Sequence, residues 1–96
     1  MVGKNEKGNT ALLQSAKKSD MWLHVKDMPS SHVIVRTDKL SVPEHVLMFA
    51  AKLCVAFSNI QPGAYLVDYT PRRNVKMIQG AFVNYVNYNT LKVSKE

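Results

Sequence analysis

DMWLHVKDMPSSHVIVR, residues 20–36, is the stretch from which the fold of this chain can be worked out. From Met21 to Lys26 the side chains alternate with a period of two, which places them on opposite faces of a β-strand. Residues 27–31 are rich in turn formers, because Pro fixes φ and short Asp and Ser side chains bond to nearby backbone N–H groups. A β-branched run over residues 32–36 follows. The stretch therefore predicts two strands joined by a tight turn.

The predicted hairpin holds more polar and aromatic groups than a core needs. It contains the chain's only Trp and two of its three His, with two Asp and two Ser. We therefore expect it to contribute to a binding surface. A structural interpretation stands beside this one: Trp22 would more commonly fill the core, and Ser31 and His32 would lock the turn. A tight turn can also present backbone N–H groups to a phosphate, so the two roles are compatible.

The same stretch resembles the signature of the NFACT-R domain, the C-terminal RNA-binding module of fibronectin-binding-protein-A-like and RqcH-like bacterial proteins. The usual motif runs Asp-x-Trp-Leu-His-Val-(Lys/Arg)-Asp-x-Pro-Gly-Ser-His-Val, and this chain departs from it at Ser30, where Gly is usual. A second similar run covers residues 67–76. Of a later Gly-Ala-Lys-Pro-Gly element only Gly80 and Ala81 are present. The resemblance extends over residues 3–93.

This resemblance implies a role in ribosome-associated quality control, in which tRNA and the large ribosomal subunit are bound while a stalled nascent chain is extended. It implies a cytoplasmic RNA-binding module that is not itself catalytic and needs no cofactor. In the larger proteins the module accompanies an N-terminal domain and a coiled coil. Nearly all of the family's first strand is missing before Gly3. We therefore expect residues 1–96 to be a single, monomeric domain excised from a larger protein, with Met1 added.

Composition is compatible with this interpretation. Thirteen basic and seven acidic residues among 96 give a net charge of +6 and a pI near 9.6, and this length suits one small domain. A basic domain favours a polyanionic partner, although charge alone fits a merely soluble basic protein equally well. Lys and Arg bind phosphate, and aromatic rings stack on unpaired bases. The predicted RNA-binding residues are Trp22, His24, Lys26, Ser31, His32, Arg36, Thr70, Arg72, Arg73 and Lys76.

Several other classes of function fit less well. The single Cys54 forms no internal disulfide, and its place in an apolar helical pattern predicts a buried structural thiol. Every apolar run is shorter than the roughly 18 residues that cross a bilayer, so no membrane partner is expected. An adhesin that binds fibronectin, the source of the family's older name, remains the alternative function.

Two kinds of chemical site can be assembled from the hairpin on paper. His24 and His32 with a nearby Asp could bind a metal, but they lack close ligand spacing and paired cysteines. Ser31, His32 and either Asp20 or Asp27 could form a hydrolase triad, but no nucleophile elbow is present. We therefore expect neither a metal nor catalysis.

Helical patterns occupy two stretches. Residues 11–18 predict a short helix capped by Thr10, with Lys17 and Lys18 at its solvated end. Residues 41–58 predict one long helix, because Ser41 and Glu44 can form a capping box. The apolar residues of this long helix form a stripe that would face a sheet: Val46, Leu47, Ala50, Leu53, Cys54 and Phe57.

The remaining segments predict further strands. Residues 65–69 and 74–78 have strand patterns, and residues 85–93 predict a last hairpin that turns near Tyr88 and Asn89. The predicted fold is therefore α+β: an antiparallel sheet of about four or five strands, one long helix packed across it, and a short N-terminal helix. Between the two middle strands, Pro71 would make residues 70–73 a rigid turn that projects both arginines toward phosphate.

Overall fold

The computed structural model describes residues 1–3, 5–37, 42–80 and 82–96. The elements follow the order α1 (Glu6–Ser15), β1 (Met21–Val25), β2 (Val33–Val35), α2 (Glu44–Phe57), β3 (Gly63–Pro71), the 3-10 turn η1 (Arg72–Asn74), β4 (Val75–Gln79), β5 (Phe82–Tyr85) and β6 (Asn89–Lys95). The α+β class is confirmed. The hairpin predicted over residues 20–36 is confirmed as β1 and β2, which pair antiparallel from Met21 opposite Val35 to Leu23 opposite Val33.

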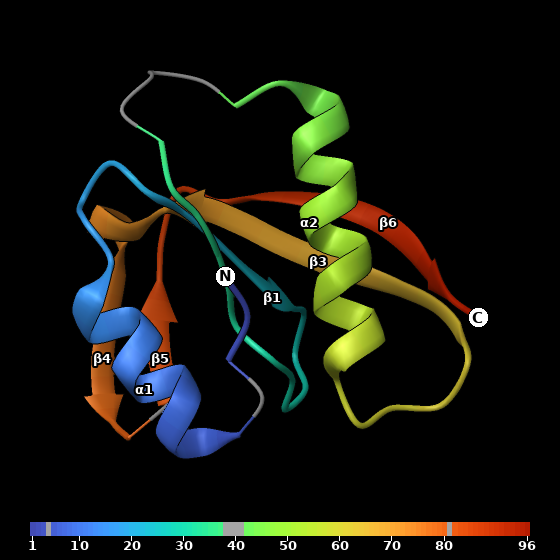
Figure 1. Ribbon diagram of the computed structural model, residues 1–96, viewed down its shortest axis with the longest axis horizontal. Helices are drawn as coiled ribbons and strands as arrows, with labels where there is room; N and C mark the ends of the chain where they lie inside the picture. The colour runs from blue at the N-terminus through green and yellow to red at the C-terminus, as the bar shows by residue number, and fades with distance from the viewer. Residues whose placement is uncertain (4, 38–41, 81) are drawn as a thin grey trace.

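The main sheet is antiparallel and has four strands, as predicted. Its strand order is β2-β1-β3-β6, and β4 and β5 form a separate two-stranded sheet that was not predicted (Figure 1). Strand β1 lies between β2 and β3, so both of its edges are hydrogen-bonded. Its two faces are buried as well, since neither Trp22 nor Leu23 has exposed surface. The chain is therefore built around β1.

Helix α2 covers one face of the four-stranded sheet (Figure 1). Its buried residues Ala51 and Cys54 belong to one core cluster with Leu23, Val67 and Val93 of the strands. Small side chains on this face bring the helix close to the sheet. The helix has Pro43 at its N-cap with no side-chain cap hydrogen bond, and Ser41, of the expected capping box, lies outside the described residues.

The stripe predicted on α2 is only partly right. Leu47, Ala50 and Cys54 are buried, but Leu53 is half-buried and Phe57 is 46% exposed. Ala51 and Val55 are buried instead and were not in the predicted stripe. The face of α2 that packs on the sheet is thus rotated about the helix axis from the predicted face. Because the helix lies close to the sheet, Ala and Val fit between them more readily than Phe.

The opposite face of β1 is covered by α1 and by the β4–β5 sheet (Figure 1). Leu12, Leu13, Trp22, Ile34 and Val75 form this second core cluster. Helix α1 begins five residues earlier than predicted. Its N-cap is Asn5, whose side chain accepts a hydrogen bond from the Gly8 backbone N–H at 2.7 Å, and the helix ends before the two lysines.

Thr10 therefore does not cap α1. It lies inside the helix, where its hydroxyl donates to the Glu6 carbonyl at 2.9 Å. A Ser or Thr hydroxyl can make this backward hydrogen bond inside a helix as readily as it can cap one. The sequence pattern alone did not separate the two uses.

The expected last hairpin over residues 85–93 is wrong. Strand β5 pairs with β4, whereas β6 pairs with β3 from Gly63 opposite Lys95 to Tyr69 opposite Asn89. The chain crosses between the two sheets at residues 86–88, where Asn87 has a φ of 53°. The Thr70 hydroxyl donates to the Val86 and Asn87 carbonyls and holds this crossing. Long-range pairing with β3 buries Val93, a gain that a local hairpin would not offer.

Candidate nucleic-acid interface

One corner of the molecule is organised by the carboxylate of Asp20, which is only 3% exposed. One oxygen accepts a hydrogen bond from the Lys17 backbone N–H at 2.8 Å, and the other accepts from the Thr37 N–H at 3.1 Å. The Asp20 carbonyl accepts from the Arg72 N–H at 2.7 Å. One residue thus joins the end of α1, the end of β2 and the start of η1.

Four exposed cations gather around this joint, and we call them the basic corner: Lys17, Lys18, Arg36 and Arg73. The Arg73 N–H donates to the Lys18 carbonyl at 3.2 Å, which places these two residues side by side. Arg36 follows Val35, which pairs with the first residue of β1. Within the described part of the chain no acidic side chain forms an ion pair with these four. Their charge is therefore available to a polyanion.

Arg72 has a different role from its neighbour. Its Nε donates to the Leu13 carbonyl at 3.0 Å and its Nη1 donates to the Val75 carbonyl at 2.6 Å. The guanidinium thus ties α1 to the start of β4, and the side chain is only partly exposed. The expectation that both arginines project from a turn is wrong for Arg72, because its guanidinium turns inward and donates to two backbone carbonyls. Arg73 is exposed, as expected.

We expect Arg72→Ala to lower the free energy of unfolding by about 1.5–3 kcal/mol, because two hydrogen bonds from a charged group to backbone carbonyls are lost. Arg73→Ala should change it by no more than about 0.5 kcal/mol, since that side chain is exposed. Chemical denaturation of the two single variants measures both values. Equal losses would show that Arg72 does not hold α1 to β4.

An aromatic cluster lies on the α1 face of β1. The Trp22 ring stacks on His24 with 5.6 Å between centroids, and lies 4.7 Å from the Tyr85 ring. The Trp22 Nε1–H donates to His32 Nδ1 at 3.1 Å, and the rings of His24 and His32 meet edge to face at 4.7 Å. Because Trp22 has no exposed surface, it cannot stack on a base. It belongs to the core, and its proposed RNA contact is corrected accordingly.

Three further predicted RNA-binding residues are buried: Ser31, His32 and Thr70. The Ser31 hydroxyl donates to the Phe57 carbonyl at 2.9 Å, and its N–H donates to the Ser58 hydroxyl at 2.9 Å. Thr70 holds the crossing between the sheets. These side chains are largely buried, and their hydrogen bonds position the surface around them.

The side chains of the hydrolase triad considered above, Ser31, His32 and an Asp, do not form the hydrogen bonds that such a triad needs. His32 Nδ1 accepts from Trp22, the Ser31 hydroxyl donates to a backbone carbonyl, and Asp20 lies at the far end of β1. Burial, with the neighbouring His24 ring as a lesser cause, lowers the pKa of His32 to about 3. Burial also lowers the pKa of His24. Both imidazoles are thus neutral at physiological pH.

Asn9 joins α1 to the hairpin. Its Oδ1 accepts from the His32 N–H at 3.0 Å, and its Nδ2 donates to the Ser30 carbonyl at 3.4 Å. The Gly3 backbone packs directly against Asn9, and a Cβ at position 3 would collide with it. Ser30, where the family has Gly, accepts from the Val25 N–H at 3.0 Å, so the substitution is accommodated by an added hydrogen bond.

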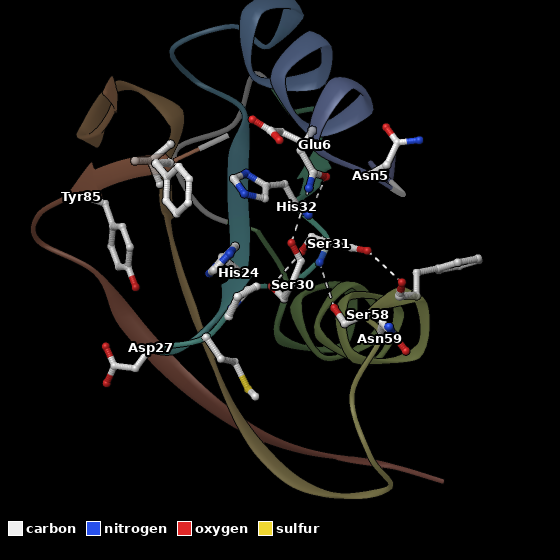
Figure 2. Close-up of a pocket in the computed structure, with 16 residues that line it drawn as sticks. Asn5, Glu6, His24, Asp27, Ser30, Ser31, His32, Ser58, Asn59 and Tyr85 are labelled. Carbon is white, nitrogen blue, oxygen red and sulfur yellow. Dashed lines mark hydrogen bonds between the residues drawn. The ribbon is translucent and has the colours of Figure 1, made fainter. Parts of the chain in front are cut away.

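A hollow of about 770 Å³ opens at the end of β1 away from the basic corner. Figure 2 shows Tyr85 and Asp27 on one side of His24, with Ser30, Ser58 and Asn59 on the other. Its lining comes from the start of α1, the β1–β2 loop, the end of α2 and β5. We call this hollow the β1 pocket. The sequence pointed to His24, Ser31 and His32 but missed the contributions of α1, α2 and β5, which lie far away along the chain.

Lys26 lies beside this pocket but is already engaged. Its ammonium donates to the Tyr88 hydroxyl at 3.2 Å, lies over the Tyr88 ring and is 3.5 Å from the carboxylate of Asp68. Asp68 is fully buried and accepts from the hydroxyls of Tyr85 at 2.6 Å and Thr90 at 2.7 Å. Burial and the Asp68 hydrogen bond raise the pKa of Tyr85. Lys26 therefore serves first to neutralise a buried carboxylate.

The predicted cations thus separate into different places. Arg36 and Arg73 both lie in the basic corner. Lys17 and Lys18, which were expected to be a solvated helix end, lie there too. Lys76 is exposed on β4, opposite Asn84 of β5. No sequence signal joins Lys18 to Arg73, because their proximity depends on a hydrogen bond between the α1–β1 turn and η1.

The structure also bears on the thiol, metal and membrane possibilities raised by the sequence. Cys54 is buried, as predicted, and burial raises its thiol pKa to about 12. Over residues 1–3, 5–37, 42–80 and 82–96 there is no group of three or more His, Cys, Asp or Glu side chains that could hold a metal ion. None of the helices in the described ranges is long and apolar enough to cross a bilayer.

A small α+β domain with a cluster of exposed cations is typical of a nucleic-acid-binding module. The chain belongs to the NFACT protein RNA binding domain family, whose profile matches residues 1–84. It is 38% identical over 92 residues to the Rqc2 homolog RqcH of Bacillus subtilis, covering 94% of this chain and 16% of that protein. The family resemblance of the sequence is thereby confirmed.

Two other proteins extend the comparison. Coiled-coil domain-containing protein 25 of Mus musculus is 30% identical over 97 residues, which cover 95% of this chain and 47% of that protein. The solved C-terminal part of the fibronectin/fibrinogen-binding protein of Streptococcus suis matches with a TM-score of 0.88 and 34% identity, covering 100% of this chain and 40% of that one. The chain thus spans less than half of each of these proteins.

Proposed function

We propose that this chain is the RNA-binding module of a bacterial ribosome-associated quality-control factor, and that it is not itself catalytic. The observation that carries the proposal is the basic corner on a domain of the NFACT RNA-binding family, since its four exposed cations form no ion pair among the described residues. Lys and Arg bind phosphate, and a rigid joint presents them together. The buried Asp20 carboxylate forms that joint, because it accepts hydrogen bonds from the backbone N–H groups of Lys17 and Thr37.

The proposed partners are tRNA and the RNA of the large ribosomal subunit. The likeness to RqcH supports this choice, because the Rqc2 homologs bear the name of a ribosome quality-control factor. In the full-length protein the module would act beside an N-terminal domain and a coiled coil, in the cytoplasm. The isolated domain would be a monomer that binds RNA weakly and with little sequence preference.

Binding to tRNA should weaken steeply with salt. Counterion release gives a log–log slope of about −0.7 for each phosphate contact to a single strand. We expect Lys18→Ala with Arg73→Ala to reduce tRNA affinity about tenfold, which is about 1.4 kcal/mol, and to make the salt slope shallower. Fluorescence anisotropy with labelled tRNA at several salt concentrations measures both.

The matched control is Lys52→Ala with Lys92→Ala, which removes the same charge from exposed positions on α2 and β6. It should retain most of the affinity. Lys17→Ala with Lys18→Ala is not a suitable control, because both lysines lie in the same corner as Arg73. If both double variants lose affinity equally, binding is diffuse attraction to a basic domain and the corner is not a site.

Fibronectin binding is the second candidate, favoured by the likeness to the Streptococcus suis protein of that name. A protein–protein contact of this kind would depend little on salt and would persist in the presence of excess tRNA. A fibronectin complex that tRNA does not displace, together with a flat salt response for tRNA, would favour this function over RNA binding.

A further inference from the structure

We infer that the β1 pocket receives an unpaired nucleobase while the basic corner holds the phosphates of the same RNA strand. This inference rests on the proposed function and adds the chemical class of ligand that a second site on the domain takes. The two sites lie at opposite ends of the five-residue strand β1, about 13 Å apart at 3.3 Å per residue. A short stretch of single-stranded RNA can span both.

The pocket has the size and rigidity of a binding site. Its volume of about 770 Å³ lies within the range of roughly 300–1,000 Å³ that holds small ligands. The wall between the β1–β2 loop and the end of α2 is held by two hydrogen bonds of Ser31, to Ser58 and to the Phe57 carbonyl. A cavity held open in this way costs little to organise on binding.

The charged side chains that line the β1 pocket disfavour a phosphate group and favour the hydrogen-bonding edge of a nucleobase. The described lining includes the carboxylates of Glu6 and Asp27 but no Lys or Arg. Among the described residues neither carboxylate has a hydrogen-bond or ion-pair partner. A carboxylate would repel a phosphate, but it accepts hydrogen bonds from amino groups of bases. The anionic part of an RNA strand is thus directed to the basic corner, and its base to the pocket.

Rings at the pocket supply stacking surface. Phe82 of β5 lines it and is 72% exposed, so most of its ring surface is not used for packing in the core. Phe57, at the end of α2, is 46% exposed and lines it too. The neutral ring of His24 also lines the pocket. Bases of unpaired RNA stack on such side chains, and this stacking tolerates any base.

The test compares an unpaired RNA octamer with a duplex of the same length, using Phe82→Ala and its matched control Ile78→Ala. Ile78 is also an apolar residue of the β4–β5 sheet and is 60% exposed, but it does not line the pocket. We expect Phe82→Ala to weaken octamer binding about tenfold and to leave duplex binding and the salt slope unchanged. Ile78→Ala should change neither. Fluorescence anisotropy gives the affinities.

A titration with adenosine, which carries no phosphate, tests the pocket independently of polyanion binding. We expect adenosine to shift amide signals of the pocket residues in the wild type, and not in Phe82→Ala. If RNA binds but Phe82→Ala behaves as Ile78→Ala does, the base pocket is overturned and the proposed function stands. If no RNA binds, the proposed function fails. Adenosine shifts confined to the pocket would still support the base site, and their absence at millimolar adenosine would overturn it.

Discussion

Trp22→Ala is expected to destabilise the fold by about 3–5 kcal/mol, the cost of truncating a fully buried aromatic residue. Small domains have only about 5–15 kcal/mol of stability in total, so this variant should be close to unfolding. The loss includes the stacking on His24 and the hydrogen bond that the indole N–H donates to His32. Thermal unfolding followed by circular dichroism measures it, as a fall in Tm of about 15 °C or more.

The matched aromatic control is Phe82→Ala, because the Phe82 ring is mostly exposed. Its Tm should stay within a few degrees of the wild type. This pair of variants separates an aromatic residue that holds the fold from one available to a ligand. A Trp22→Ala protein that keeps its Tm and loses RNA binding would overturn the structural role and restore Trp22 as a stacking platform.

Acidification is expected to destabilise the domain through His32. Its folded pKa, about 3, lies below the ordinary value of 6.5, so the unfolded chain binds the extra proton. Stability is therefore fully present above pH 6.5 and is lost as the pH falls from there toward 3. At about 1.4 kcal/mol per pH unit, the loss between pH 7 and pH 5 is about 2 kcal/mol, and His24 adds to it in the same direction. Urea denaturation at both pH values measures it.

Two variants check that His32 is the source of this pH dependence. His32→Asn retains an acceptor for the Trp22 N–H but cannot take up the proton, so stability should fall less between pH 7 and pH 5. His45→Gln should leave the profile unchanged, since His45 is exposed at the start of α2. An unaltered slope in His32→Asn would assign the effect to another group.

The local part of the fold could be predicted from the sequence because its cause is local. The period-two pattern around Trp22 predicted β1, and the Asp-Pro-Ser composition after it predicted the turn to β2. The same stretch carried the family resemblance that the profile match confirms. The burial of Cys54 was also correctly predicted, since an apolar helical pattern surrounds it.

The errors of prediction share one physical origin. Residues 85–93 have the pattern of a hairpin, yet β6 pairs with β3 because that pairing adds a fourth strand to the main sheet and buries Val93. The arginines of residues 72–73 look alike in the sequence, but only Arg72 lies near two backbone carbonyls that accept hydrogen bonds from it. Residues that are adjacent and alike in the sequence thus have different roles, because they contact different segments that are far away along the chain.

The sequence by itself therefore determined the hairpin of β1 and β2, the α+β class, the family and the excess of positive charge. These depend on side-chain period, turn chemistry and composition, which a chain carries before it folds. Only the tertiary structure decided that Trp22 and His32 are buried, that Lys18 lies beside Arg73, and that Phe82 and Phe57 line one pocket. A surface formed by segments far apart in the chain exists only once long-range hydrogen bonds and core packing have brought them together.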